Sequence, residues 1–147
     1  MDNIVEFDIL KTKVLKYILY KKRTEKEVRK KFQQSDDALL EDVINYLKEA
    51  GYINDEEYIQ RAVNEFINLK TLSIREISYK LYSKGLKNEL IEEYMENQRE
   101  ALDIYEKDNA KKIFYKKRQM MSNEDIIIFL RKKGYKEESI KFGLKEE

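Results

Sequence analysis

Histidine and cysteine are both absent from the 147-residue sequence, and each absence excludes a class of chemistry. Most transition-metal sites and most nucleophile–base pairs need one of these side chains. A chain without cysteine forms no disulfide, which fits the reducing cytoplasm. The longest apolar run, Ile126–Leu130, is far shorter than the roughly 20 residues that cross a membrane. We therefore expect a cytoplasmic protein with no catalytic residue, no metal site, no cofactor and no membrane partner.

The composition favours an all-α protein. Charged residues make up 40% of the chain, hydrophobic residues make up 41%, and proline is absent. Apolar residues recur at helical spacing, which is typical of helices that bury one face. We predict nine helices, of which the first runs over about 6–20, the third over about 37–50 and the sixth begins near Lys87. Whether the sixth and seventh helices are continuous near Asn97 stays open, because neither glycine nor proline separates them.

The stretch Thr24–Phe32 recurs twice at a spacing of 49 residues. Each copy begins with a hydroxyl residue and has an acidic residue three positions later, which is the pattern of a helix-capping box. We expect Thr24, Ser73 and Ser122 to be structural caps. Three glycines, Gly51, Gly85 and Gly134, are predicted to end helices. Together these features predict an elongated, curved array of three tandem three-helix repeats over 1–54, 55–97 and 98–147.

The net charge of +1 conceals an uneven distribution. Residues 55–103 sum to −4 and residues 104–147 to +4. Clustered cations toward both ends are candidates for contact with phosphates or with an acidic protein surface. They are Lys21, Lys22, Arg23, Lys30, Lys31, Lys116, Lys117, Arg118, Arg131, Lys132 and Lys133. The alternative is that they are solvated helix faces, as most charge runs are.

Three further sequence patterns could suggest a metal site or a catalytic group, but each fits a structural role better. The acidic segment Gly51–Tyr58 lacks the twelve-residue loop and the alternating oxygen ligands of a calcium site. The eleven tyrosines lie mostly on apolar helical faces, which favours core packing or base stacking over a nucleophilic role. Neighbouring carboxylates such as Glu92 and Glu93 do not face one another on a helix. We find no catalytic constellation.

Several motifs occur together in a recognisable order. Arg23-Thr24 precedes Glu27-Val28, the segment GYIND begins at Gly51, and a Lys-Gly-hydrophobic triplet follows at 84–86 and again at 133–135. From about residue 7 to Leu144, this arrangement resembles the bacterial RecX regulatory proteins. The resemblance implies three tandem three-helix repeats. It also implies a regulator that lies along the groove of the RecA–DNA filament and mostly inhibits the recombinase.

The sequence departs from that family's pattern in three ways. The first repeat has no glycine after its second helix, Leu72 and Met121 take the place of Arg23 in the later copies, and the net charge is close to zero. Since the caps and apolar faces recur, they define the fold. Function is expected where the copies differ, at Arg23 and at Lys30 and Lys31 in the first copy.

Three hypotheses follow for the function. The leading one is a monomeric, non-catalytic regulator that binds a RecA-type recombinase filament through a concave face and basic ends. The second is a direct binding module for single- or double-stranded DNA, because a three-helix unit can present a helix-turn-helix. The third is a generic helical scaffold for protein partners. An enzyme fits the sequence least.

Overall fold

The structure is a computed structural model that describes residues 3–145. Within that range the chain forms nine α-helices and no β-strand. The helices are α1 (Asn3–Tyr20), α2 (Glu25–Lys31), α3 (Asp37–Glu49), α4 (Asp55–Leu69), α5 (Ile74–Ser83), α6 (Asn88–Asn97), α7 (Arg99–Lys117), α8 (Asn123–Lys133) and α9 (Glu137–Leu144). None of these helices is both long enough and apolar enough to cross a membrane.

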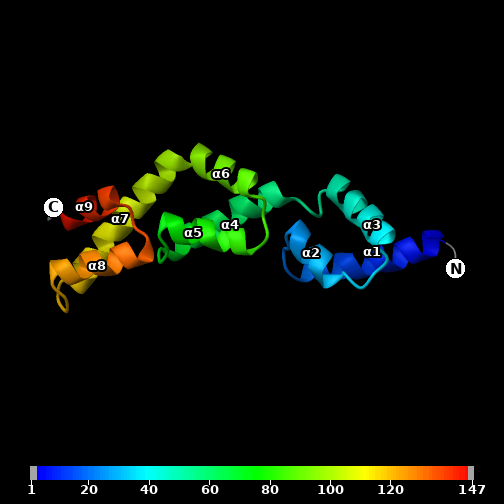
Figure 1. Ribbon diagram of the computed structural model, residues 1–147, viewed down its shortest axis with the longest axis horizontal. Coiled ribbons are helices and arrows are strands. Elements are labelled where there is room, and N and C mark those ends of the chain that lie inside the picture. The colour runs from blue at the N-terminus through cyan, green and yellow to red at the C-terminus, as the bar shows by residue number, and fades with distance from the viewer. Residues whose placement is uncertain (1–2, 146–147) are drawn as a thin grey trace.

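The helices form an elongated row of three units, which we call unit 1 (α1–α3), unit 2 (α4–α6) and unit 3 (α7–α9) (Figure 1). Each unit buries a hydrophobic cluster of its own, centred on residues such as Val28 in unit 1, Ile77 in unit 2 and Phe114 in unit 3. Two side chains of α7 contribute to the cluster of unit 2: Leu102 is a buried member, and Tyr105 packs against it. The predicted all-α array is therefore present, whereas the 49-residue period and the predicted repeat boundaries stay predictions.

Two details of the helices differ from, or complete, the sequence prediction. Helix α1 begins at Asn3, before the predicted start. Its extra turn carries Ile4 and Val5, which are 69% and 46% exposed, so it lies outside the apolar pattern of the buried face. The open question about the sixth and seventh helices is answered by Gln98, whose φ of −102° and ψ of 11° interrupt the helical backbone. The chain bends there, as Figure 1 shows between α6 and α7.

The three cap residues occupy helix N-termini in the structure. Thr24 and Ser73 each form a complete capping box, in which the hydroxyl accepts a hydrogen bond from the N3 backbone and the N3 glutamate accepts one from the cap backbone. Ser122 accepts a hydrogen bond from the Asp125 backbone at 3.2 Å, but Asp125 makes no return bond within residues 3–145. Aspartate is one methylene shorter than glutamate, which reduces its reach.

The hydroxyls of Thr24 and Ser73 have a second partner in the next unit. Thr24 Oγ1 donates to the carbonyl oxygen of Lys84 at 2.9 Å, and Ser73 Oγ donates to the carbonyl oxygen of Lys133 at 2.7 Å. Both pairs are 60 residues apart in sequence. The same hydroxyl oxygen accepts from a helix N–H and donates to a carbonyl, so an ionised Asp, which has no donor, would lose the second bond.

Each hydroxyl bond belongs to a larger set of contacts that we call the inter-unit clasp. The glutamate of each capping box pairs with the same lysine, at 3.8 Å for Glu27–Lys84 and 3.6 Å for Glu76–Lys133. The residue after each of these lysines is a glycine with positive φ, 82° at Gly85 and 93° at Gly134. The clasp therefore joins the two recurring motifs of the sequence, one from each neighbouring unit.

The clasp glycines are required by space as well as by backbone conformation. A Cβ atom at Gly85 would lie 2.3 Å from Cδ of Lys26, and one at Gly134 would lie 2.8 Å from Cδ of Arg75. The aliphatic stems of these two basic residues therefore pack directly over the next unit. At Gly51, which also has positive φ, such a Cβ would meet no atom of the described residues within 4 Å apart from its chain neighbours.

Acidic side chains from the next unit complete both junctions. Asp55 Oδ1 accepts from the backbone N–H of Glu25 at 3.0 Å, and burial raises the pKa of that aspartate above its ordinary value. At the second junction, fully buried Glu106 accepts from Ile74 N at 2.7 Å and from Lys136 N at 2.9 Å. Glu106 thus holds the N-termini of α5 and α9 together from its place on α7.

Candidate partner-binding groove

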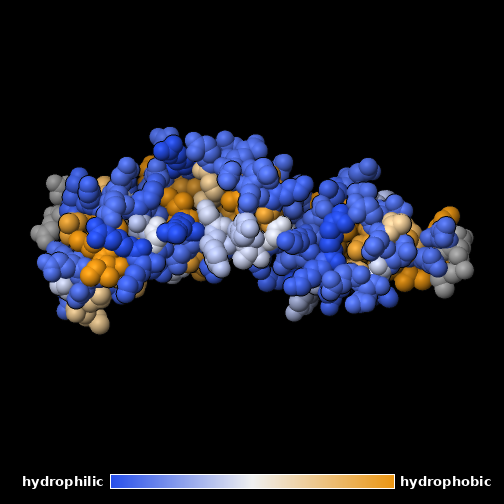
Figure 2. Space-filling view, in the orientation of Figure 1, coloured by the Kyte–Doolittle hydropathy of each residue, from blue (hydrophilic) through white to orange (hydrophobic). Residues whose placement is uncertain are grey.

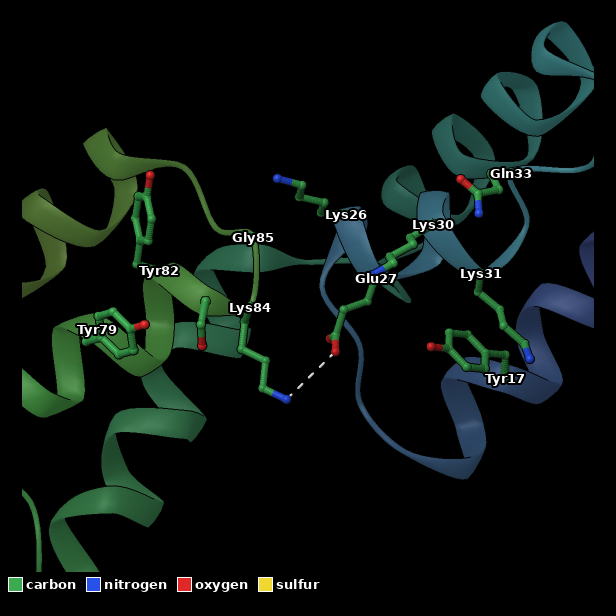
Figure 3. Close-up of a pocket in the computed structure, with 11 residues that line it drawn as sticks. Tyr17, Lys26, Glu27, Lys30, Lys31, Gln33, Tyr79, Tyr82, Lys84 and Gly85 are labelled. Atoms are coloured by element: carbon green, nitrogen blue, oxygen red, sulfur yellow. Dashed lines mark ion pairs between the residues drawn. The ribbon is translucent and has the colours of Figure 1, made fainter.

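A groove of about 920 Å³ lies between units 1 and 2. Helix α2 contributes lysines to one wall, and the C-terminal half of α5 contributes tyrosines to the other (Figure 3). The clasp crosses the groove, where Figure 3 shows Lys84 reaching toward Glu27. Its principal lining residues are Tyr17, Lys26, Glu27, Lys30, Lys31, Tyr79, Tyr82, Lys84 and Gly85.

The groove carries an excess of positive charge. Four lysines line it and a single glutamate, Glu27, is engaged with Lys84. Within the described part of the chain, no carboxylate pairs with Lys26, Lys30 or Lys31. By contrast Arg29, on the same helix, is held by Glu25 at 3.0 Å and by Glu41 at 2.7 Å. Lys26 and Lys30 are therefore available to an anionic partner, whereas the ammonium of Lys31 also lies 5.7 Å from the centroid of the Tyr17 ring.

The tyrosines of the groove differ in what their rings can contact. Tyr79 and Tyr82 stand about one turn apart on α5 and are 72% and 58% exposed. Tyr17 is half-buried, and the Arg23 guanidinium lies over its ring at 4.1 Å. The Tyr17 ring is thus already occupied by a cation–π contact. Tyr79 and Tyr82 present aromatic surface to solvent.

The predicted N-terminal cations fall into two groups in the structure. Lys30 and Lys31 line the groove, and Lys21 is exposed nearby in sequence without an ion pair among the described residues. Lys22 lies 3.7 Å from Glu57 of the next unit. Arg23 packs on Tyr17, and its buried Nε has no hydrogen-bond partner in the described part of the chain. At this position the first repeat copy differs from the other two, and the Arg23 side chain therefore packs within unit 1.

The first predicted C-terminal cluster, at the end of α7, is only partly free. Lys116 is exposed, whereas the Lys117 ammonium lies 4.5 Å from the centroid of Phe129. Arg118 donates to the Leu144 carbonyl at 2.8 Å and lies over the Phe114 ring. Replacing Arg118 would thus disturb the packing of α9 on α7.

The second C-terminal cluster, at the end of α8, is similar. Arg131 forms a two-pronged pair with Glu137 at 2.6 and 3.2 Å, and this hydrogen bonding raises the pKa of its guanidinium. Lys133 belongs to the clasp. Lys132 is exposed, and no ion pair involves it within residues 3–145. The structure does not gather the predicted cations into one patch, because α2 and α8 belong to different units (Figure 1).

Sequence reasoning missed several residues of the groove, among them Lys26, Tyr79, Tyr82 and Lys84. They lie about fifty residues apart in two segments that only the stacking of units brings together. One available signal was the recurrence of a basic residue two positions after the first two caps, at Lys26 and Arg75. The hydropathy surface gives little further guidance, since Figure 2 shows a mostly hydrophilic face with hydrophobic patches between helices and over α8.

Comparison with known sequences places the chain beside one group of proteins. No family model matches the chain. The regulatory protein RecX of Staphylococcus epidermidis is 31% identical over 155 residues, and that of Staphylococcus haemolyticus is 29% identical over 161. Each match covers 99% of this chain and 58% of the relative. The chain thus spans somewhat over half the length of these curated proteins.

Solved structures show the same fold. The crystal structure of RecX from Lactobacillus salivarius superposes with a TM-score of 0.80 at 20% identity and covers 96% of both chains. A second crystal structure, of a regulatory protein RecX, gives a TM-score of 0.74 at 21% identity over 92% of this chain and 71% of that one. The all-α fold predicted from the sequence is therefore confirmed.

Proposed function

Since this chain belongs to the RecX family of regulatory proteins, we propose that it binds the filament of a RecA-type recombinase on DNA and inhibits the recombinase. The observation that carries the proposal is the lysine- and tyrosine-lined groove between units 1 and 2. It lies on an elongated body, which suits a partner that is itself extended and repetitive (Figure 1). Cations without carboxylate partners complement phosphates or acidic protein surfaces.

The proposal includes the manner of action. The protein acts in the cytoplasm as a monomer, without metal or cofactor, and by occupying the filament rather than by catalysis. The absence of histidine and cysteine supports a non-catalytic role, because most nucleophilic and metal-dependent mechanisms use them. The contacts that bind the filament are proposed to include the groove and two exposed cations of unit 3, Lys116 and Lys132.

The test measures recombinase ATP hydrolysis and strand exchange on single-stranded DNA while the protein is added. We expect both rates to fall at protein amounts comparable to or below the recombinase. The double variant Lys116→Glu and Lys132→Glu should inhibit less, because it reverses two exposed charges. Both side chains lack ion pairs within residues 3–145, so circular dichroism should show unchanged helicity. An undisturbed recombinase in the presence of excess wild-type protein would overturn the proposal.

A further inference from the structure

We propose that the groove between α2 and α5 binds single-stranded nucleic acid, with phosphates on the lysines of α2 and unpaired bases on the tyrosines of α5. This inference rests on the proposed function and names the component of the filament that the groove would contact. It is carried by three properties of the groove: its unneutralised charge, its exposed aromatic rings and its position across a junction.

The charge comes first, because it would supply most of the affinity. Lys26, Lys30 and Lys31 place three ammonium groups on a helix of seven residues, and all three line the groove. A phosphate backbone that follows α2 would displace one counterion for each lysine that it meets. Lys84 contributes less, because its ammonium lies 3.8 Å from Glu27.

The tyrosines select unpaired bases. Tyr79 and Tyr82 expose 72% and 58% of their surface on the opposite wall, with no aromatic partner among the described residues. Rings in this position stack on any base whose face is open. Base faces within a duplex are covered by the neighbouring base pairs, so the rings would add nothing to duplex binding.

A second hollow extends the tyrosine wall beyond the groove. It has a volume of about 380 Å³ and is lined on one side by the same Tyr79 and Tyr82, with Arg75 and Met95 among its other residues. The two rings therefore form a ridge between two depressions. A single strand that crosses the ridge has a basic side chain on either side, Lys26 before it and Arg75 after it.

The position of the groove links binding to the shape of the molecule. One wall belongs to unit 1 and the other to unit 2, and the clasp sets their separation. The stem of Lys26 packs over Gly85, which fixes the root of that side chain beside the tyrosine wall. A strand in the groove would contact both units at once.

The test is fluorescence anisotropy with a labelled 15-nucleotide oligo-dT and a duplex of the same length, at several salt concentrations. We expect the single strand to bind more tightly than the duplex. The logarithm of affinity should fall with the logarithm of salt concentration with a slope of about −2, from three lysines at about 0.7 each. Equal affinity for the duplex would overturn the inference.

Variants separate the two kinds of contact. Tyr79→Ala and Tyr82→Ala should each weaken single-strand binding roughly tenfold with an unchanged salt slope, and the Phe variants should restore it. Lys30→Gln and Lys31→Gln should each reduce the slope by about 0.7. The matched control is Tyr115→Ala with Lys112→Gln on α7, an exposed ring and cation outside the groove, which should bind as wild type.

The outcomes also distinguish this inference from the proposed function. If the recombinase is inhibited but oligo-dT does not bind, or binds equally to all groove variants, the inference is wrong and the proposed function stands. If oligo-dT binds through the groove but the recombinase is undisturbed, the proposed function is wrong and the groove is a nucleic-acid site alone. Loss of binding in the α7 control with retention in the groove variants would move the site to unit 3.

Discussion

Val28→Asp is expected to lower the free energy of unfolding by about 4 kcal/mol, because it places a carboxylate in a core that offers it no partner. Val28 is fully buried in the cluster of unit 1, together with residues such as Val14 and Ile44. Helix α2 has only seven residues and depends on this contact for its stability. Urea denaturation followed by circular dichroism measures the loss.

Two control variants separate the effect of the lost Val28 contacts from the effect of the added charge. Val28→Ala removes the same contacts without adding charge and should cost about 2 kcal/mol. Gln60→Asp introduces an aspartate at an exposed position of α4 and should change stability by about 0.5 kcal/mol or less. A denaturation midpoint for Val28→Asp equal to that of wild type would show that the inner face of α2 is not part of the core.

Glu106→Leu is expected to cost about 4 kcal/mol through the junction between units 2 and 3. The leucine would leave the backbone N–H groups of Ile74 and Lys136, whose bonds to Glu106 are part-buried, without that acceptor, at about 1–3 kcal/mol each. Lys136 is the N-cap residue of α9, and its own side chain forms no capping bond within residues 3–145, so α9 depends on Glu106. Loss of the carboxylate also removes a favourable charge from the N-terminus of α5.

Hydrogen exchange locates the Glu106 effect. The amides of Ile74 and Lys136 should exchange faster in Glu106→Leu, while amides of α1 and α3 keep their wild-type rates. Glu106→Gln should fall between the two proteins, since its single carbonyl accepts one of the two bonds and its NH₂ group opposes the other N–H. Wild-type stability together with unchanged exchange at both amides would contradict the proposed role of Glu106.

The sequence was most informative where the evidence is local. A cap, an acid three residues later and an apolar face are contained in ten residues, and Thr24 and Ser73 form the capping boxes that this pattern predicts. The glycines after α3, α5 and α8 likewise have the positive φ of helix ends. Such features depend on backbone geometry within one helix, so one stretch of sequence is enough to predict them.

The contacts between units could not be predicted in the same way. The donor Thr24 and the acceptor carbonyl of Lys84 are 60 residues apart. Every residue has a backbone carbonyl, so the residue type does not show which carbonyl accepts the bond. The same holds for the groove, whose walls come from α2 and α5. Glu106 was a missed signal of another kind. It lies on the inward face of α7 between Leu102 and Ala110. A buried acidic side chain at such a position needs hydrogen-bond donors from elsewhere in the structure.

The predicted cations show why charge patterns alone locate a binding surface poorly. In sequence, Arg131 and Lys132 are adjacent and are equally good candidates for binding an anionic partner. In the structure Arg131 is held by Glu137, whereas Lys132 has no ion pair among the described residues. A charged side chain on an exposed helix surface has several possible ion-pair partners. Only the three-dimensional arrangement determines which of these side chains remain unpaired.

The most direct test of the account is the structure, by electron cryomicroscopy, of this protein bound to a recombinase filament on single-stranded DNA. We predict that units 1 and 2 bind with the α2–α5 groove facing the filament, and that Tyr79 and Tyr82 lie within contact distance of the filament. Density that places this groove on the solvent side of a bound molecule would contradict the account.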